Sequence, residues 1–472
     1  MRQTKRVMTQ ICFYDRTGIQ KMLEKQAQKG WMLESIGQLG WKYRRIEPKN
    51  VRFAVTYYAN ASMFDPEPTV GEELYQEFVE YSGWHFVASN AQMQIFCTED
   101  ENPVPIETDP MVELQNIHRA VKKSFLPGYF MMLCCALLNL GLMVWRLADN
   151  FTGTLSHNTN LFTISCWIIL ALLEIYEISA YYLWRRKALK AAQLDGSFVE
   201  TKNRNNLMLV ILGVVFAAYI LMISSLSPRI AYIGVISVVL MLLAVAVVLL
   251  LINWMKKTGF SREDNRAYTI LATVFISLAV TFLSTVAIIT VMEQLPDDHV
   301  KDTYEINGIT ITRYGDDVPL TVEQLTGENM EDYSTYKTLE SSILIDRLIA
   351  NQHRKHGTGE GSDLRYVVVN VKFAPLFEAC LREYLTMYHD QQIVDIFGYE
   401  YYRDFRSIDP TAWGADEAWQ LYSKEEALTE YLLVYGNRIV NFDFSQEPTR
   451  EQMALVAEVL GGEQNIENKE NK

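Results

Sequence analysis

The chain has 472 residues, of which 49% are hydrophobic, and its 43 Lys and Arg against 57 Asp and Glu give a net charge of −14. This length leaves room for two or three domains. The acidic excess lies after Glu293, and neither end of the chain has the pronounced basic face that nucleic-acid binding requires, so we expect no nucleic-acid partner.

Residues 1–100 show the short alternating strands and amphipathic helices of an α+β domain. The helix over 18–29 has Asp15 as its expected cap. The predicted elements are a strand over 9–14, that helix, strands over 31–36, 41–46 and 51–59, a helix over 70–81, and strands over 84–89 and 93–98.

The pattern of a predicted helix followed by glycine and tryptophan occurs at two places, Gly30-Trp31 and Gly83-Trp84. This echo predicts two β-α-β-β units that form an α+β sandwich, with the helices on one face of an antiparallel sheet. We expect Trp31 and Trp84 to fill the interface between helices and sheet; a ligand pocket built on the two rings is the alternative.

The opening Cys12-Phe13-Tyr14-Asp15, the stretch Lys29–Leu33 and the later Tyr81-Ser82-Gly83-Trp84 resemble bacterial membrane proteins that begin with domain of unknown function 2812. The resemblance covers residues 1 to about 100 best, and longer members have a similar layout of spans and a C-terminal soluble part. It implies a bacterial membrane protein, often associated with transcriptional regulators of the PadR type. It implies no reaction and no catalytic residues.

A polar linker with a juxtamembrane helix occupies 101–124, and a membrane block follows over 125–292. Each of its apolar runs has about 20 residues or more, enough to cross a hydrocarbon core of about 30 Å. Because no cleavable signal peptide precedes them, we expect the first span to direct insertion. The five predicted spans are 126–145, 161–184, 207–226, 230–254 and 268–292.

Lys and Arg gather before the first span, between the second and third, and between the fourth and fifth. An excess of these residues marks the cytoplasmic side of a membrane. The pattern therefore predicts a multi-pass protein of the cell membrane with a cytoplasmic N-terminal domain. An odd number of spans then places the C-terminal domain outside the cytoplasm.

Two carboxylates, Glu174 and Glu177, lie within the second predicted span and share one helix face. Carboxylates inside a membrane are costly and often mark paths for ions or protons. The simpler interpretation is that both pack inside the helix bundle, bonded to hydroxyl groups or to Asn139 of the first span. They are the candidate functional residues of the membrane block.

Residues 293–460 predict a second α+β domain, and 461–472 a disordered polar tail. Asn307-Gly308 is typical of a hairpin turn, and a second hairpin is expected over 430–444 around Gly436. The stretch 337–354 fits a helix or a strand. Residues 364–372 predict a strand, and 374–388 and 449–460 predict helices, the last capped by Thr449.

The sequence lacks the motifs of the common catalytic, cofactor and metal sites. The six cysteines have no zinc-site spacing, Cys380 lies in an amphipathic helix, and His353 and His356 share a face only if their stretch is helical. The glycine-rich Gly357–Gly361 lacks the Lys and Ser or Thr of a phosphate-binding loop. We therefore predict no catalytic residue, no cofactor and no metal.

Three functions fit these observations. The leading hypothesis is a non-enzymatic protein that links the cytoplasm to the cell surface by binding, in sensing or envelope regulation, with a protein partner besides the bilayer. The second is a transporter, or a subunit accessory to one, that uses Glu174 and Glu177. The third is an enzyme of the outer domain, with a site among the acidic and aromatic residues of Tyr399–Trp419.

Overall fold

A computed structural model gives the fold of the chain in two compact units. One unit comprises Met1–Leu138 with Cys166–Leu295, and the other Asn139–Ser165 with Pro296–Lys472. The first two long helices therefore contribute to both units. The structure describes residues 3–7, 14–37, 40–194, 196–201, 205–224, 228–294, 300–306, 309–354, 362–388, 393–394 and 400–462.

The N-terminal domain repeats one folding unit, as predicted. Its elements are β1 (Thr4–Val7), α1 (Arg16–Gln28), β2 (Trp31–Gly37), β3 (Gly40–Arg45), β4 (Arg52–Tyr57), α2 (Val70–Tyr81), β5 (His85–Asn90) and β6 (Met93–Thr98). The predicted strand over 9–14 falls largely outside the described residues, and the observed first strand lies at Thr4–Val7.

The two β-α-β-β repeats of the N-terminal domain form two separate sheets, so the prediction of one antiparallel sheet was wrong. The first sheet has the order β1-β3-β2 and the second β4-β6-β5. Within each repeat the last strand lies between the other two. The edge strands β2 and β5 of the two sheets lie close together, but no backbone ladder joins them among the described residues. The pairing of each of these strands with its own central strand shifts register, between Leu33 and Ser35 and between Phe86 and Ala88, and such irregularities bend a strand and disrupt regular pairing.

Capping residues begin both helices, Asp15 as the sequence predicts and Thr69 as the structure adds. The Asp15 side chain accepts a hydrogen bond from the Gly18 amide at 3.0 Å, and Thr69 caps α2 through the Glu72 amide. Each helix ends at a glycine in the left-handed region, Gly30 at φ 77° and Gly83 at φ 87°. A residue with a β-carbon is disfavoured there.

The two tryptophans differ in environment. Trp84 is 4% exposed in a small core with Ala54, Val79 and Phe96, which confirms the packing prediction for this ring. Trp31 is only half-buried, with the Lys5 Nζ 4.4 Å from its ring centroid. The expectation of a fully packed ring is therefore wrong for Trp31, which lies at the margin of the larger core beneath cationic side chains.

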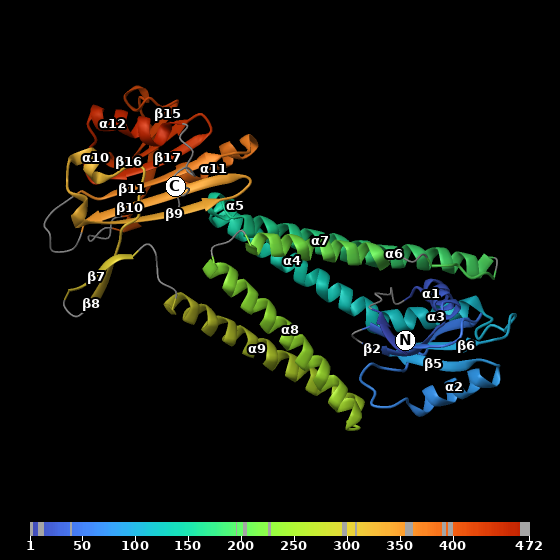
Figure 1. The fold of residues 1–472 in the computed structure, drawn as a ribbon. Helices are drawn as coiled ribbons and strands as arrows, with labels where there is room; N and C mark the ends of the chain where they lie inside the picture. The colour runs from blue at the N-terminus through green and yellow to red at the C-terminus, as the bar shows by residue number, and fades with distance from the viewer. Residues whose placement is uncertain are drawn as a thin grey trace. The chain divides into compact units, whose positions relative to one another are not determined.

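Long helices follow the N-terminal domain. They are α3 (Pro110–Ala120), the π-helical turn η1 (Val121–Phe125), α4 (Leu126–Asp149), α6 (Asn158–Leu194), α7 (Asn205–Ser224), α8 (Pro228–Lys257) and α9 (Arg262–Gln294). The segments α3, η1 and α4 form one continuous helix over Pro110–Asp149. Helices α8 and α9 lie side by side (Figure 1).

Among the described residues, four helices are long and apolar enough to cross a membrane: Pro110–Asp149, Asn158–Leu194, Tyr232–Lys257 and Arg262–Thr290. The remaining predicted span, 207–226, corresponds to α7, which is not among these four. Four candidate spans are therefore established, and the count of five stays a prediction.

The C-terminal domain is built on a seven-stranded antiparallel sheet with the order β14-β15-β16-β17-β11-β10-β9. Its strands are β9 (Tyr333–Ser341), β10 (Ile345–Arg354), β11 (Leu364–Val371), β14 (Arg403–Ser407), β15 (Glu417–Ser423), β16 (Glu426–Tyr435) and β17 (Arg438–Phe444). The ambiguous stretch 337–354 thus forms strands, because both neighbours of β10 supply partners for its backbone.

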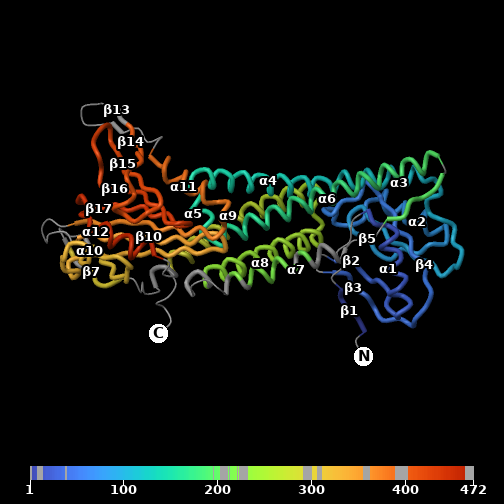
Figure 2. The backbone as a smooth tube through the Cα atoms, turned by 90° about the horizontal axis from the view of Figure 1, so that it is seen from above, coloured from blue at the N-terminus to red at the C-terminus, as the bar shows by residue number. Residues whose placement is uncertain are grey.

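Both faces of this sheet are covered. Tyr366 and Val368 of β11 point into a core with α10 (Val322–Thr326) and α12 (Arg450–Val456), whereas Val367 and Val369 face α11 (Phe377–Thr386). The alternation follows the period of two of a strand. Thr449 caps α12 as predicted. Figure 2 shows the strands seen from above.

The smaller elements of this unit include a separate hairpin of β7 (Val300–Ile306) and β8 (Ile309–Tyr314). It confirms the predicted hairpin, although Asn307 and Gly308 themselves lie outside the described residues. The other short pieces are α5 (Phe151–Leu155), η2 (Met330–Asp332), η3 (Ala374–Leu376), β12 (Ile393–Val394), β13 (Glu400–Tyr401), η4 (Thr411–Trp413) and η5 (Ala457–Gly461).

Candidate ligand-binding site

An ion pair joins the first helix of the N-terminal domain to the helix that continues into the membrane block. The Arg16 guanidinium, at the start of α1, pairs with the Glu113 carboxylate of α3. Glu113 is only 6% exposed, and its Oε2 has no hydrogen-bond partner among the described residues. A buried carboxylate with a free oxygen is costly, so this position is unusual for a purely structural residue.

A cavity of about 420 Å³ lies beside this ion pair, large enough for a small molecule. Its walls come from α1, β4, the linker before α3, α3 itself and the loop after α6. Its lining includes Arg16, Thr56, Trp84, Glu107, Asn116 and Phe198. Polar groups from several parts of the first unit therefore converge on one hollow.

A second carboxylate lines the cavity from the linker. The Asn116 amide of α3 donates to Glu107 Oε1 at 3.1 Å, while Glu107 Oε2 has no partner among the described residues. Burial raises the pKa of Glu107 above its ordinary value, and it outweighs the opposing effects of Asn116 and Arg16. The buried Thr56 hydroxyl, on β4, also lines the cavity and interacts with the Tyr75 hydroxyl.

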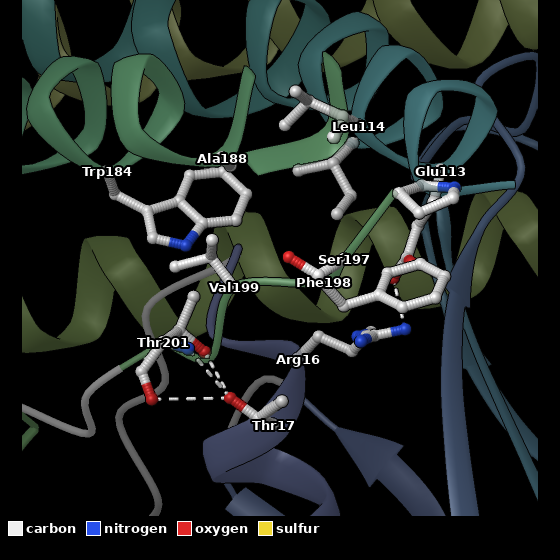
Figure 3. Close-up of a pocket in the computed structure, with 13 residues that line it drawn as sticks. Arg16, Thr17, Glu113, Leu114, Trp184, Ala188, Ser197, Phe198, Val199 and Thr201 are labelled. Atoms are coloured by element: carbon white, nitrogen blue, oxygen red, sulfur yellow. Dashed lines mark hydrogen bonds and ion pairs between the residues drawn. The ribbon is translucent and has the colours of Figure 1, made fainter. Parts of the chain in front are cut away.

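The loop after α6 closes the site from another direction (Figure 3). The Phe198 ring lies 5.2 Å from the Arg16 guanidinium carbon, and Arg16 points between Phe198 and Glu113. The Thr201 amide donates to the Thr17 hydroxyl at 2.9 Å. A small neighbouring cavity of about 30 Å³, which Trp184 and Leu114 help to line, lies between this loop, α3 and α6. Arg16 and Glu113 border both cavities.

The first turn of α9 also contacts the N-terminal domain. Arg262 Nη2 donates to Asp65 at 2.8 Å, and the Asn265 side chain donates to the Phe64 carbonyl at 2.8 Å. The sequence has three segments rich in Lys and Arg. The segment after α6 and the segment that reaches the start of α9 lie next to these contacts with the N-terminal domain, and the remaining segment directly precedes α4.

The turn between α4 and α6 belongs to the other unit and packs into the C-terminal domain. Leu155 lies in a core with α11, and the Ser342 hydroxyl donates to its carbonyl at 2.6 Å. The Ser156 hydroxyl donates to Glu340 at 2.6 Å. Residues 152–156 are all buried, so this turn is an integral part of the C-terminal domain.

Glu174 is buried in α6, at 5% exposure, with Oε2 unpartnered among the described residues. It lines a cavity of about 430 Å³ with Ser124, Gly128 and Tyr129, at the start of α4. Glu177 is half-buried and does not line this cavity. Glu174 thus faces η1 and the first turn of α4, and the expected bonding to hydroxyl groups or to Asn139 stays a prediction.

The acidic residues proposed for an enzyme of the outer domain stabilise local structure where they are described. Asp404 pairs with Arg406, Asp409 accepts from the Thr411 amide at 3.0 Å, and Asp416 accepts from the Gly436 amide at 2.7 Å. His353 lies on a strand, and His356 is outside the described residues. No group of three His, Cys, Asp or Glu suited to a metal occurs among the residues that the structure describes.

Residues 15–128 match the model of the family described as Protein of unknown function (DUF2812). The resemblance noted from the sequence is thus confirmed, and the match extends beyond residue 100 through α3 to the first turn of α4. The DUF2812 match therefore includes Arg16, Glu107, Glu113 and Asn116. No curated protein and no solved structure matches the chain.

Sequence reasoning did not find this site. The signal that was present is Glu113, which shares the apolar face of its helix with Leu114, Ile117 and Ala120. A glutamate on the buried face of an amphipathic helix needs a partner, and Arg16 is far from it in the sequence. Only the tertiary fold of the DUF2812 region brings the two together.

Proposed function

We propose that this protein is a non-enzymatic membrane sensor, which binds a small molecule in the cavity of the N-terminal domain and transmits its presence to the membrane helices. One observation carries the proposal. Helix α3 supplies Glu113 and Asn116 to the cavity and continues without a break through η1 into α4. Any shift of α3 on ligand binding therefore moves the start of a candidate span.

The second helix of the membrane block supports the same function. Phe198, in the loop after α6, lines the cavity, so a ligand there touches segments attached to both α4 and α6. The π-helical turn between α3 and α4 is a further sign, because such turns are frequent at functional sites. Binding that favours one arrangement of these helices over another is what a sensor requires.

The proposal includes the orientation expected from the charges. The loop after α6 and the first turn of α9 contact the N-terminal domain, and they belong to the segments rich in Lys and Arg. By the positive-inside rule these connections and the N-terminal domain are cytoplasmic. With five spans, α7 included, the C-terminal domain lies outside. A protein partner on the cytoplasmic side then receives the signal.

A cavity-filling variant tests the sensor. Asn116→Trp fills the cavity from α3, and Gln115→Trp adds the same ring at the neighbouring exposed position as a control. The full-length protein in nanodiscs is screened with a small-molecule library by thermal shift. At least one compound is expected to stabilise wild type and Gln115→Trp but not Asn116→Trp, and to change hydrogen exchange over 121–128. Compounds that stabilise all three proteins equally, or none at all, contradict the proposal.

Transport is the second candidate, because Glu174 is a buried carboxylate with a free oxygen beside a cavity. Glu174→Gln keeps the size and the hydrogen-bonding capacity but removes the titratable group. Under the sensor hypothesis this variant inserts at wild-type levels and keeps its function. Loss of a phenotype that Glu177→Gln retains, at equal expression, favours transport.

A further inference from the structure

The charges around the cavity of the N-terminal domain do not balance. Of the two inner carboxylates, Glu113 pairs with Arg16, while Glu107 has only the neutral Asn116 amide. At the mouth, Glu24 and Arg52 lie 3.9 Å apart and offset each other. The inner part therefore has one acidic group more than it has bases.

One oxygen of each inner carboxylate, Glu107 Oε2 and Glu113 Oε2, is buried and lacks a hydrogen-bond donor among the described residues. Burial raises the pKa of both groups, that of Glu113 to about 7, and a bound cation favours their ionised forms, whose oxygens only accept. Leaving such atoms unpaired costs about 1–3 kcal/mol each. A ligand that supplies N–H donors and one positive charge meets both the hydrogen-bonding and the charge deficit.

The remaining lining suits an organic body. Trp84, Pro103, Pro105 and Ile106 give an apolar wall, and the Trp84 ring is fixed because its Nε1 donates to the Val104 carbonyl at 2.9 Å. An aromatic face attracts cations. The apolar side chains of this wall cannot coordinate a bare metal ion, and the cavity volume of about 420 Å³ is larger than an ion fills.

We propose that the cavity binds a small organic cation, a protonated amine with an apolar body, whose ammonium group lies between Glu107 and Glu113 and whose body rests against Trp84. This inference depends on the proposed sensor function and adds its ligand class. The Thr56 hydroxyl, which also lines the cavity and interacts with the Tyr75 hydroxyl, offers a further acceptor.

Matched ligands test which ligand charge the cavity prefers in the wild-type protein. Tryptamine, tryptophol and indole-3-propionate share one ring body but carry a cation, a neutral hydroxyl and an anion; phenethylamine and its alcohol and acid counterparts form a second set. Titration into the full-length protein in nanodiscs is expected to show each amine binding at least tenfold more tightly than its neutral and anionic counterparts.

Variants locate the effect and separate the two proposals. Glu107→Gln is expected to abolish the preference for amines, and Asn116→Trp is expected to prevent binding. The control Glu73→Gln, at an exposed position that does not line the cavity, is expected to keep the preference. A neutral or anionic compound that binds best, and is blocked by Asn116→Trp, overturns the cation assignment while the sensor stands. If no compound of these sets or of the library binds in a manner sensitive to Asn116→Trp, both proposals fail.

A different observation concerns the outer face of α2. Four apolar side chains are strongly exposed at helical spacing, with relative exposures of 74% for Val70, 60% for Leu74, 66% for Phe78 and 91% for Tyr81. They form one stripe, because residues three and four apart share a helix face. The opposite face, with Glu72 and Val79, is buried in the domain. An exposed apolar stripe of this kind marks an interaction surface.

The charges of α2 identify the occupant. Glu73, Glu77 and Glu80 border the stripe on one side, and α2 contains no Lys or Arg. An anionic membrane surface repels such a helix, and a symmetric contact between two copies of α2 places like charges together. We infer that the stripe docks into an apolar groove of a protein partner whose rim carries Lys or Arg.

Photo-crosslinking from position 74 tests this contact in cells, with position 73 as the matched control on the acidic border. The expected product is a covalent adduct whose partner peptide is apolar and contains Lys or Arg, formed in wild type and lost in Phe78→Glu. Adducts with lipid or with a second copy of this chain overturn the inference, and so does the absence of any crosslinked partner peptide. Phe78→Glu is exposed, so the fold is expected to survive.

Discussion

The Thr152 amide donates a hydrogen bond to the Glu383 carboxylate at 2.8 Å, which joins the turn between α4 and α6 to helix α11 of the C-terminal domain. The Thr152 hydroxyl contacts the same oxygen, and Thr152 is 1% exposed. A charged acceptor for buried donors contributes more than an ordinary hydrogen bond. This contact helps to hold the turn between two candidate spans within the C-terminal domain.

Glu383→Ala should therefore loosen the turn from the domain. Because the Thr152 donors lose their acceptor while remaining buried, we expect a cost of about 1–3 kcal/mol. Hydrogen exchange of the full-length protein over 152–156 should accelerate, whereas the exposed Glu378→Ala on the same helix serves as the control. Equal exchange in Glu383→Ala and wild type would show that the contact does not hold the turn.

The orientation is open to a reporter experiment. An enzyme that is active only outside the cytoplasm should work when fused after Glu293 and be silent after Lys123 or Lys190. The reason is the concentration of Lys and Arg in the connections adjoining the N-terminal domain. Activity at Lys190 together with silence after Glu293 reverses the proposed topology.

The two tryptophans should differ in their effect on stability. Trp84→Ala removes a ring that is 4% exposed and should cost about 3–5 kcal/mol, whereas the half-buried Trp31 should cost about 1–2 kcal/mol. Hydrogen exchange of the strands in the N-terminal domain measures the local opening free energy in the full chain. A larger cost for Trp31→Ala contradicts the environments described above.

The pH dependence of the C-terminal domain should include Glu430. Its carboxylate, on β16, accepts from the Asn441 amide at 2.8 Å and from the Tyr388 hydroxyl at 3.0 Å, but burial dominates and raises its pKa above the ordinary 4.5. Because the folded state holds this proton more tightly than the unfolded state, the contribution is fully present below pH 4.5 and is lost as pH rises through the folded pKa.

Glu430→Gln removes this group and should flatten the part of the decline that Glu430 causes; Asp443, whose pKa burial also raises, keeps its own share. Thermal unfolding of the full-length protein at several pH values gives the measurement. The exposed Glu426→Gln on the same strand is the matched control. A decline that is as steep in Glu430→Gln as in wild type would show that the buried carboxylate is not responsible.

The sequence by itself determined the local structure and the candidate spans. Apolar runs of about 20 residues, the caps Asp15, Thr69 and Thr449, and the glycines after α1 and α2 depend on neighbouring residues only, so they are readable along the chain. The repeat of Gly30-Trp31 and Gly83-Trp84 revealed the two β-α-β-β units for the same reason.

Only the tertiary structure decided how these pieces meet. The two repeats form separate sheets although their edge strands β2 and β5 lie close together, and the shifts of register in both strands disrupt regular pairing. The cavity depends on Arg16, Glu107, Glu113 and Phe198, which come from four segments that no local pattern connects. Burial of a charge in such a place is a property of the folded environment, and a sequence shows the charge but not what surrounds it.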